Sequence, residues 1–461
     1  MAKLAMLGFL VLLLLLPVSR ILSLVHERMA RRDMVTAEIT RTWGGPQALT
    51  GPVLTLPVRI GRQVPIIQRV QADDGSTVEV PATVDGEVTT RTVWESHDLQ
   101  ILPSKLTWTG RIEPDVRNRG LFEVVVYEAN LRAVGSFEMP EVEAEGRQVD
   151  WPRAEVALGV PDVRGLTQEV DLTWGDRSLE LQPGVGRSGQ VGYGIHTPIP
   201  DLDQVAVGDT VFFAFDLALR GAGDLLFVPA GTTTEVRIES PWPAPGFTGA
   251  FLPAERQISD QGFSAAWEVP SFGRGFPEVG WTKEVEPHVL TSSAFGVSLV
   301  LEADAYQQTE RSVKYAVLFI ILTFGTFFLL ELLSRSRLHA VQYLLVGFAL
   351  SLFYVLLLAL SEHFGFGLAY ALAAVATVLL IAGYSRSLLG GSRAGWILGS
   401  LSLLYGYLYI LLQLEDYALL VGAVGLFAVV ALIMMATRNL DWFSLRFRGD
   451  HGPSSGAGAP V

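Results

Sequence analysis

The sequence predicts a membrane protein made of an α-helical transmembrane bundle and a large all-β extracytoplasmic domain. Three observations predict this class: long apolar runs at both ends of the chain, short β-forming runs between them, and a charge distribution that separates the two regions. The 461 residues are 50% apolar and 18% charged, against about 25% charged in ordinary soluble domains. Because a single soluble core does not explain so apolar a chain, we expect part of it to lie in lipid.

Six apolar runs are long enough to cross about 30 Å of hydrocarbon, which takes about 20 helical residues. One lies at the N-terminus and five follow residue 311; they span 4–25, 315–333, 341–361, 366–384, 394–413 and 417–436. The alternative is a set of buried helices in a large soluble core. So many runs with almost no charge favour membrane spans.

The first run has a second interpretation, as a cleaved signal peptide. No clear small-x-small cleavage site follows it, and apolar residues continue past Pro17 to Val25. We therefore expect it to remain as an anchor. A helical stalk should continue it as far as the Trp43-Gly44-Gly45-Pro46 break.

The loops between the runs alternate in charge, which predicts their orientation. The loops at Glu362-His363 and Glu415-Asp416 carry no Lys or Arg, whereas arginines follow the second, fourth and sixth runs: Arg335, Arg337, Arg386, Arg393, Arg438, Arg446 and Arg448. The positive-inside rule therefore predicts cytoplasmic N- and C-termini and places residues 33–311 outside. The arginines after the first run oppose this orientation, and we give more weight to the alternation over five runs.

Residues 43–311 consist of short β-forming runs separated by Gly and Pro every eight to twelve residues. Alternation at 234–239 predicts strands with one wet face, hence sandwich-like sheets. A typical sandwich takes only about 100 residues, so we expect two lobes with a boundary near 184–194, or one extended sandwich. The predicted domains are an anchor and stalk (1–42), the β-rich domain (43–311), five transmembrane helices (312–436) and a largely disordered cytoplasmic tail (437–461).

The formal net charge of −13 is concentrated in the β-rich region. Residues 1–32 carry +4 and residues 312–461 carry +2, which leaves −19 for residues 33–311. A surface this acidic repels phosphates, which argues against nucleic acid as a partner. The chain has no cysteine, so disulfides, thiol nucleophiles and cysteine metal sites are excluded.

The motifs of enzymes are absent, and we expect no catalytic residue, no cofactor and no metal site. Residues 184–189 match the dinucleotide fingerprint by letters, but they follow Pro183 and open no helix, so a turn is the better interpretation. There is no nucleophile elbow, zinc-binding helix or phosphate-binding loop. His97, His196 and His288 have no ligand spacing.

Ionisable residues in or beside the spans are the default functional candidates. Glu331 lies near the predicted cytoplasmic end of its run, where snorkelling to the interface explains it. Glu362, His363, Glu415 and Asp416 lie at the outer ends of runs. A solvated loop explains these four residues, and the alternative is a shared acidic pocket beneath the β domain.

Ordered strings occur in both halves of the chain, including Leu338-His339-Ala340-Val341-Gln342-Tyr343, Gln413-Leu414-Glu415-Asp416-Tyr417, Arg119-Gly120-Leu121-Phe122 and Phe251-Leu252-Pro253. These strings resemble the CreD family of bacterial inner-membrane proteins. The resemblance implies a role in cell envelope integrity, under a two-component system that responds to carbon source and cell-wall stress. It supplies no catalytic residue and no ligand.

We therefore expect a non-enzymatic, multi-pass inner-membrane protein that supports envelope integrity by binding or scaffolding through its β domain. The expected partners are the lipid bilayer and envelope proteins or cell-wall components. The alternative is a transporter, or a protein that handles lipids or envelope precursors, with a site at the outer leaflet. An envelope hydrolase would require distant residues of the β domain to converge.

Overall fold

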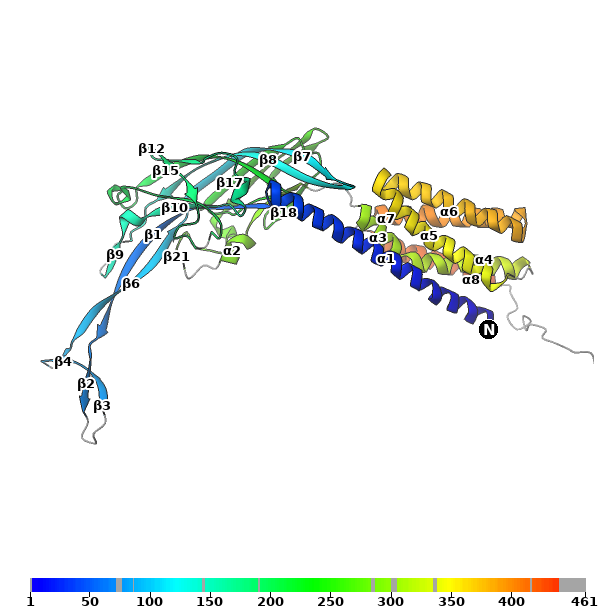
Figure 1. Ribbon diagram of the computed structural model, residues 1–461, viewed down its shortest axis with the longest axis horizontal. Helices are drawn as coiled ribbons and strands as arrows, with labels where there is room; N and C mark the ends of the chain where they lie inside the picture. Colours follow the sequence, from blue (N-terminus) through cyan, green and yellow to red (C-terminus); the bar gives the residue numbers. More distant parts are fainter. Residues whose placement is uncertain are drawn as a thin grey trace, which may run out of the picture. The chain divides into compact units, whose positions relative to one another are not determined.

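The computed structural model describes residues 2–71, 77–85, 87–142, 146–189, 191–282, 287–299, 305–334, 338–414 and 417–438. The chain divides into two compact units. One is helical and combines Met1–Arg28 with Ala305–Val461, and the other is β-rich and comprises Met29–Asp304. Figure 1 labels their elements.

Two large sheets make up the β-rich unit. The ten-stranded sheet has the order β13-β14-β10-β1-β16-β22-β18, with β6 and β9 also paired to β1 and β21 paired to β6. Its strands are β1 (Gln47–Pro65), β6 (Thr90–Ile101), β9 (Arg147–Val149), β10 (Glu155–Gly159), β13 (Gln182–Pro183), β14 (Gly194–Pro198), β16 (Asp224–Phe227), β18 (Pro245–Gly249), β21 (Val279–Trp281) and β22 (Phe295–Leu299).

The eight-stranded sheet has the order β12-β11-β15-β8-β7-β17-β20-β19. Its strands are β7 (Lys105–Arg119), β8 (Phe122–Glu138), β11 (Asp171–Trp174), β12 (Arg177–Glu180), β15 (Thr210–Ala222), β17 (Thr233–Ser240), β19 (Glu255–Ser259) and β20 (Gly262–Pro270). Two small hairpins, β2 (Ile67–Gln71) with β3 (Thr77–Pro81) and β4 (Thr83–Val84) with β5 (Glu87–Val88), lie at the far end of the β1–β6 ribbon (Figure 1). A short helix, α2 (Pro287–Ser292), precedes β22.

Alternation along the strands decides which face of each sheet is buried. In β8, Leu131 and Ala133 are buried, whereas Asn130 and Arg132 are exposed. Successive side chains of a strand point to opposite faces, so this pattern gives the eight-stranded sheet an apolar inner face and a wet outer face.

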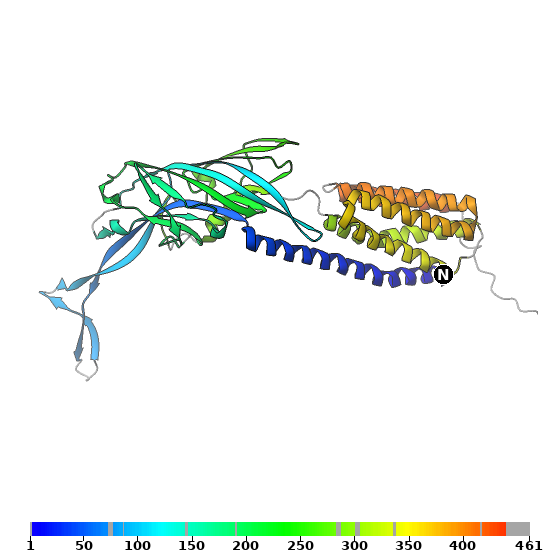
Figure 2. The ribbon, with the colours of Figure 1, turned by 45° about the horizontal axis from the view of Figure 1, so that its top comes forward.

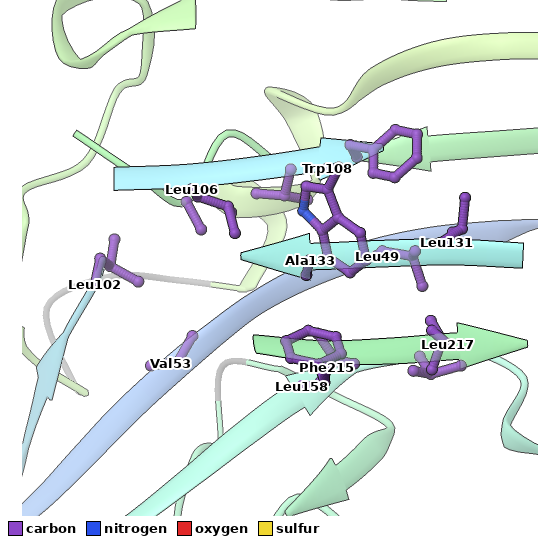
Figure 3. Packing of buried hydrophobic residues seen from close by; sticks show 14 of the residues in the cluster. Leu49, Val53, Leu102, Leu106, Trp108, Leu131, Ala133, Leu158, Phe215 and Leu217 are labelled. Atoms are coloured by element: carbon purple, nitrogen blue, oxygen red, sulfur yellow. The ribbon is translucent and has the colours of Figure 1, made fainter. Parts of the chain in front are cut away.

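One hydrophobic core lies between the two sheets. The ring centroid of Trp108 in the eight-stranded sheet lies 5.5 Å from that of Phe227 in the ten-stranded sheet. Figure 3 shows Trp108 and Phe215 in the same layer as Leu49 of β1. Of the two predicted arrangements, two lobes or one extended sandwich, the structure has the second, because large side chains from both sheets close one continuous layer.

The end of α1 (Ala2–Trp43) joins the sandwich through a specific aromatic contact. The guanidinium groups of Arg117 and Arg220 both stack on the Trp43 ring, 4.7 Å and 4.5 Å from its centroid. Its Nε1 donates to the carbonyl oxygen of Tyr127 at 3.3 Å. These contacts attach residues 29–43 of α1 to the β-rich unit.

The chain leaves α1 through two glycines, as the sequence predicts. Gly44 has a φ of +145°, and a Cβ there would lie 2.6 Å from the carbonyl oxygen of Arg220, so only glycine fits. The next amide, of Gly45, donates to the carboxylate of Asp162 at 3.0 Å. A side-chain hydrogen bond from Arg164 holds the pKa of Asp162 below its ordinary value.

The helical unit contains α3 (Ala305–Lys314), α4 (Ala316–Ser334), α5 (Ala340–Phe364), α6 (Phe366–Leu389), α7 (Gly391–Gln413) and α8 (Ala418–Thr437), together with residues 2–28 of α1. His339 caps α5, because its side chain accepts from the amide of Val341 while Gln342 accepts from the amide of His339. Gly365 and Gly390, with φ of +73° and +85°, provide the turns on either side of α6.

Among the described residues, the helices support four or five of the six predicted membrane crossings. Four helices are long and apolar enough to cross a membrane: α1, α5, α6 and α7. The pair α3 and α4 also passes if it forms one crossing bent by 47°. The described apolar part of α8, Ala418–Leu432, is shorter than such a crossing. The described helices thus support four crossings, or five with the bent pair.

Residues 2–28 of α1 pack as a member of the bundle. The buried side chains recur every three or four residues and form one stripe: Leu7, Leu10, Leu14, Val18, Ile21 and Val25. Leu14 is fully buried against α5, where a Cβ on Gly347 would lie 2.2 Å from a Leu14 methyl group. Figure 2 shows this part of α1 alongside the other helices.

Candidate functional site

At one end of the helical bundle, Glu331 forms a buried polar cluster. Its side chain pairs with the ammonium of Lys3 and accepts from the hydroxyl of Tyr343 at 2.9 Å. Lys3 also donates to the carbonyl oxygen of Leu338 at 3.1 Å. Glu331 is only 8% exposed, so the expectation that it snorkels to the interface is wrong. A buried carboxylate needs a partner, and α1 supplies it.

At the opposite end of the bundle, Glu362 is held by two other helices. Its Oε1 accepts from the hydroxyl of Tyr306 on α3 at 3.2 Å and lies 3.5 Å from Nε of Arg28 on α1. The Glu362 side chain is 9% exposed. This carboxylate is therefore part of an interhelical ion pair, and its side chain is largely buried rather than solvated as a loop residue would be.

The same end of the bundle carries a second paired carboxylate. Oε1 of Glu310 lies 3.2 Å from Nε2 of His26 and 2.8 Å from Nζ of Lys314. Nearby, the guanidinium of Arg311 donates to the carbonyl oxygen of Leu414 at the end of α7 at 3.5 Å. Polar contacts thus tie α1, α3, α5 and the end of α7 together at this end.

The other predicted site residues do not join this network among the described residues. His363 is exposed, and its ring packs edge-on against that of Phe364, with centroids 6.4 Å apart. Glu415 and Asp416 lie outside the described residues. The shared acidic pocket therefore stays a prediction. The sequence could not reveal the partners of Glu362, because they come from segments remote in the chain.

The glycine-rich segment at 184–189 forms a turn between β13 and β14, as expected. Gly186 has a φ of +51°. The amide of Arg187 donates to the carboxylate of Glu155, so this turn binds a side chain of the protein itself and not a cofactor phosphate. The Arg187 side chain pairs with Asp98 at 2.9 Å. Within the described part of the chain, no group of three or more His, Cys, Asp or Glu side chains is placed to hold a metal ion.

A polar hollow of about 880 Å³ lies on the outer face of the eight-stranded sheet. Arg111, Arg132 and Arg237 line it together with acidic, amide and hydroxyl side chains from neighbouring strands: Asn130, Asp216, Glu239, Glu255 and Ser264. We call this hollow the arginine trough. The sequence showed that these strands have a wet face, but it did not show that the arginines converge.

Strand register places the three arginines around Thr109. Thr109 of β7 pairs with Arg132 of β8 on one side and with Arg237 of β17 on the other. Two strand spacings separate these arginines, or about 10 Å, and Arg111 lies two residues along β7, or about 7 Å away. All three therefore project from the same face around a small side chain.

The three arginines differ in how they are neutralised. Arg132 lies 3.3 Å from both carboxylate oxygens of Asp216. Arg111 pairs with Glu113, and the hydrogen bond to that carboxylate raises the pKa of Arg111. Among the described residues, no ion pair within 4.0 Å involves Arg237. Arg237 can thus bind an external anionic group without first breaking an ion pair within the protein.

The comparison with known families covers both units. The sequence model of the family described as "Inner membrane protein CreD" matches residues 1–443. The chain belongs to the CreD family. A curated member, "Inner membrane protein CreD" of Escherichia coli (strain K12), is 34% identical over 447 residues, which cover 94% of this chain and 92% of the relative. The family resemblance is confirmed, and with it an inner-membrane protein whose apolar helices contact the lipid bilayer.

Proposed function

We propose that this CreD family protein is non-enzymatic and supports cell envelope integrity by binding an envelope protein or cell-wall component through its β-rich unit. The observation that carries the proposal is the arginine trough, an open hollow with three guanidinium groups in a strongly acidic region. Planar guanidinium groups recognise carboxylates and phosphates by paired hydrogen bonds. The trough offers this chemistry on a rigid sheet.

The composition of the trough favours binding over catalysis. Nucleophilic catalysis needs a hydroxyl or thiol beside a general base. Thr109 and Ser264 supply hydroxyl groups, but no histidine or lysine is among the described residues that line the trough. Its carboxylates lie in an open hollow beside arginines, an arrangement that suits the binding of charged groups.

We further propose that both termini are cytoplasmic and that residues 33–311 are periplasmic. Lys3 contacts Glu331 and Leu338, so the N-terminus and the α4–α5 connection lie at the same end of the bundle. Arg335 and Arg337 belong to that connection and favour the cytoplasmic side. The packing therefore supports the orientation drawn from the alternating loops, against the local charge of the first run.

Charge reversal in the trough tests the binding role. The variant R132E/R237E should fail to restore envelope integrity to a strain that lacks the protein, measured as leakage of periplasmic protein and sensitivity to detergent. The matched control is Arg256→Glu, on an exposed position of β19 outside the trough. Full rescue by the trough variant at normal protein levels would contradict the proposal, as would rescue by the membrane helices alone.

The alternative function, transport or lipid handling at the outer leaflet, depends on the predicted residues at the Arg28 end of the bundle. The ion pair between Arg28 and Glu362 is the observation in its favour, since ionisable groups in or beside membrane spans are often functional. Neutral replacement of Glu362, Glu415 and Asp416 tests it. An unchanged envelope phenotype with normal protein levels would count decisively against this function.

A further inference from the structure

A second hollow, of about 560 Å³, lies between α6 and α7. On α6 it is lined by Gly367, Ala371 and Ala374, which share one face because they are spaced four and three residues apart. On α7 its lining includes Tyr405 and Tyr409, also four residues apart. We call this hollow the α6–α7 groove. Small residues on α6 leave the space open.

Three tyrosines line the groove and form what we call its aromatic floor: Tyr370, Tyr405 and Tyr409. The Tyr370 hydroxyl donates to the carbonyl oxygen of Tyr405 at 2.7 Å. The rings of Tyr370 and Tyr409 lie 5.3 Å apart, centroid to centroid, at 47°. The aromatic floor is therefore rigid, and it offers mainly carbon surface to an occupant.

The length of the groove matches one leaflet of a bilayer. On α6 the lining extends from Gly367, in the first turn, to Leu379, and twelve residues rise by about 18 Å in a helix. Half of a hydrocarbon core is about 15 Å thick. The groove also begins just after Glu362 and His363, so it belongs to the leaflet at the Arg28 end of the bundle.

We propose that the α6–α7 groove holds one hydrocarbon chain of a bilayer lipid from that leaflet. The groove is continuous with surface that already faces lipid: Leu368 and Leu372 on α6 and Leu403 and Ile410 on α7 are exposed in helices that cross the membrane. Within lipid, association depends on close packing rather than on the hydrophobic effect. A chain between two helices and an aromatic floor makes more carbon contacts than a chain in the bilayer.

Photocrosslinking of the full chain in lipid vesicles tests this proposal. The probe is phosphatidylethanolamine with a diazirine on one acyl chain, present as a trace in vesicles of phosphatidylethanolamine and phosphatidylglycerol. Crosslinks should concentrate on groove residues of α6 and α7. Filling the groove with Ala371→Phe should lower their yield about fivefold, the size expected from losing on the order of ten carbon–carbon contacts.

The control variant is Ala376→Phe, which adds the same ring at an exposed position of α6 outside the groove. This variant should leave the crosslink yield unchanged. Equal yields in both variants, or crosslinks spread evenly over all lipid-facing helices, would overturn the proposal. Unfolding of both variants in micelles shows whether they retain the fold.

A protein occupant would be detected in the same system. A photoreactive phenylalanine analogue in place of Ala371 should capture lipid. Capture of a second copy of the chain, or of a helix from another membrane protein, would overturn the proposal. The result is independent of the arginine trough, because neither variant alters the β-rich unit.

Discussion

Replacing Glu331 by Ala tests how the first helix is held in the bundle. In the folded protein, Glu331 binds Lys3, 328 residues away, and accepts from the Tyr343 hydroxyl. The variant leaves the Tyr343 hydroxyl, on a residue that is 2% exposed, without its acceptor. It also leaves Lys3 without its counter-charge. Both effects destabilise the folded state relative to the unfolded state.

The size of the effect follows from the burial of each group. Removing one partner of a buried ion pair costs about 3–5 kcal/mol, and an orphaned buried hydroxyl costs about 1–3 kcal/mol. The Lys3 side chain is 21% exposed and keeps its hydrogen bond to Leu338, so the lower end of the ion-pair range applies. We expect Glu331→Ala to cost about 3 kcal/mol, and Tyr343→Phe about 1 kcal/mol because it removes only one hydrogen bond.

A double-mutant cycle isolates the ion pair. We expect Lys3→Met to cost about 2 kcal/mol and the double variant to cost less than the two changes summed, with a coupling energy of about 1–2 kcal/mol. This lies near the upper limit of polar couplings in membrane proteins, about 1.7 kcal/mol. The assay is reversible unfolding in mixed micelles at pH 7. Additivity within about 0.3 kcal/mol would refute the reasoning.

Three further predictions concern the core, the α1 junction and the Arg28 end of the bundle. Trp108→Ala removes a side chain that is 1% exposed at the sheet interface, and should lower the free energy of unfolding by about 3–5 kcal/mol in denaturant titration; a loss below about 1 kcal/mol would contradict the single core. Asp162→Asn should destabilise by about 1 kcal/mol at pH 7, because the folded-state pKa of Asp162 lies below the unfolded value of 3.8. That difference should shrink as the pH falls through the lowered pKa, and thermal unfolding at pH 7 and pH 3 measures it; a pH-independent difference would be inconsistent with the ion pair. Glu362→Gln should cost about 1 kcal/mol in micelles, because Arg28 is 35% exposed, whereas His363→Gln, at an exposed position, should cost nothing measurable; equal losses would argue against the Glu362 ion pair.

Local periodicity determined much of this protein from sequence alone. Runs of apolar residues predicted α5, α6 and α7, and Gly365 and Gly390 lie where α5 and α6 end. Alternation along the strands predicted two-faced sheets, and the Trp43-Gly44-Gly45-Pro46 break predicted the end of α1. These features depend on residues close together in the chain, so short-range patterns contain the necessary information.

Contacts between remote segments were decided only by the tertiary structure. The sequence predicted an interfacial carboxylate at Glu331, whereas the structure pairs it with Lys3 from the other end of the chain. It predicted a solvated loop at Glu362, whereas the structure places this side chain against Arg28 and Tyr306. Strand register, which alternation does not specify, gathered three arginines around Thr109. The physical reason is common to all of them: the partner of a charge and the neighbour of a strand depend on packing across long loops, and a local pattern does not encode that choice.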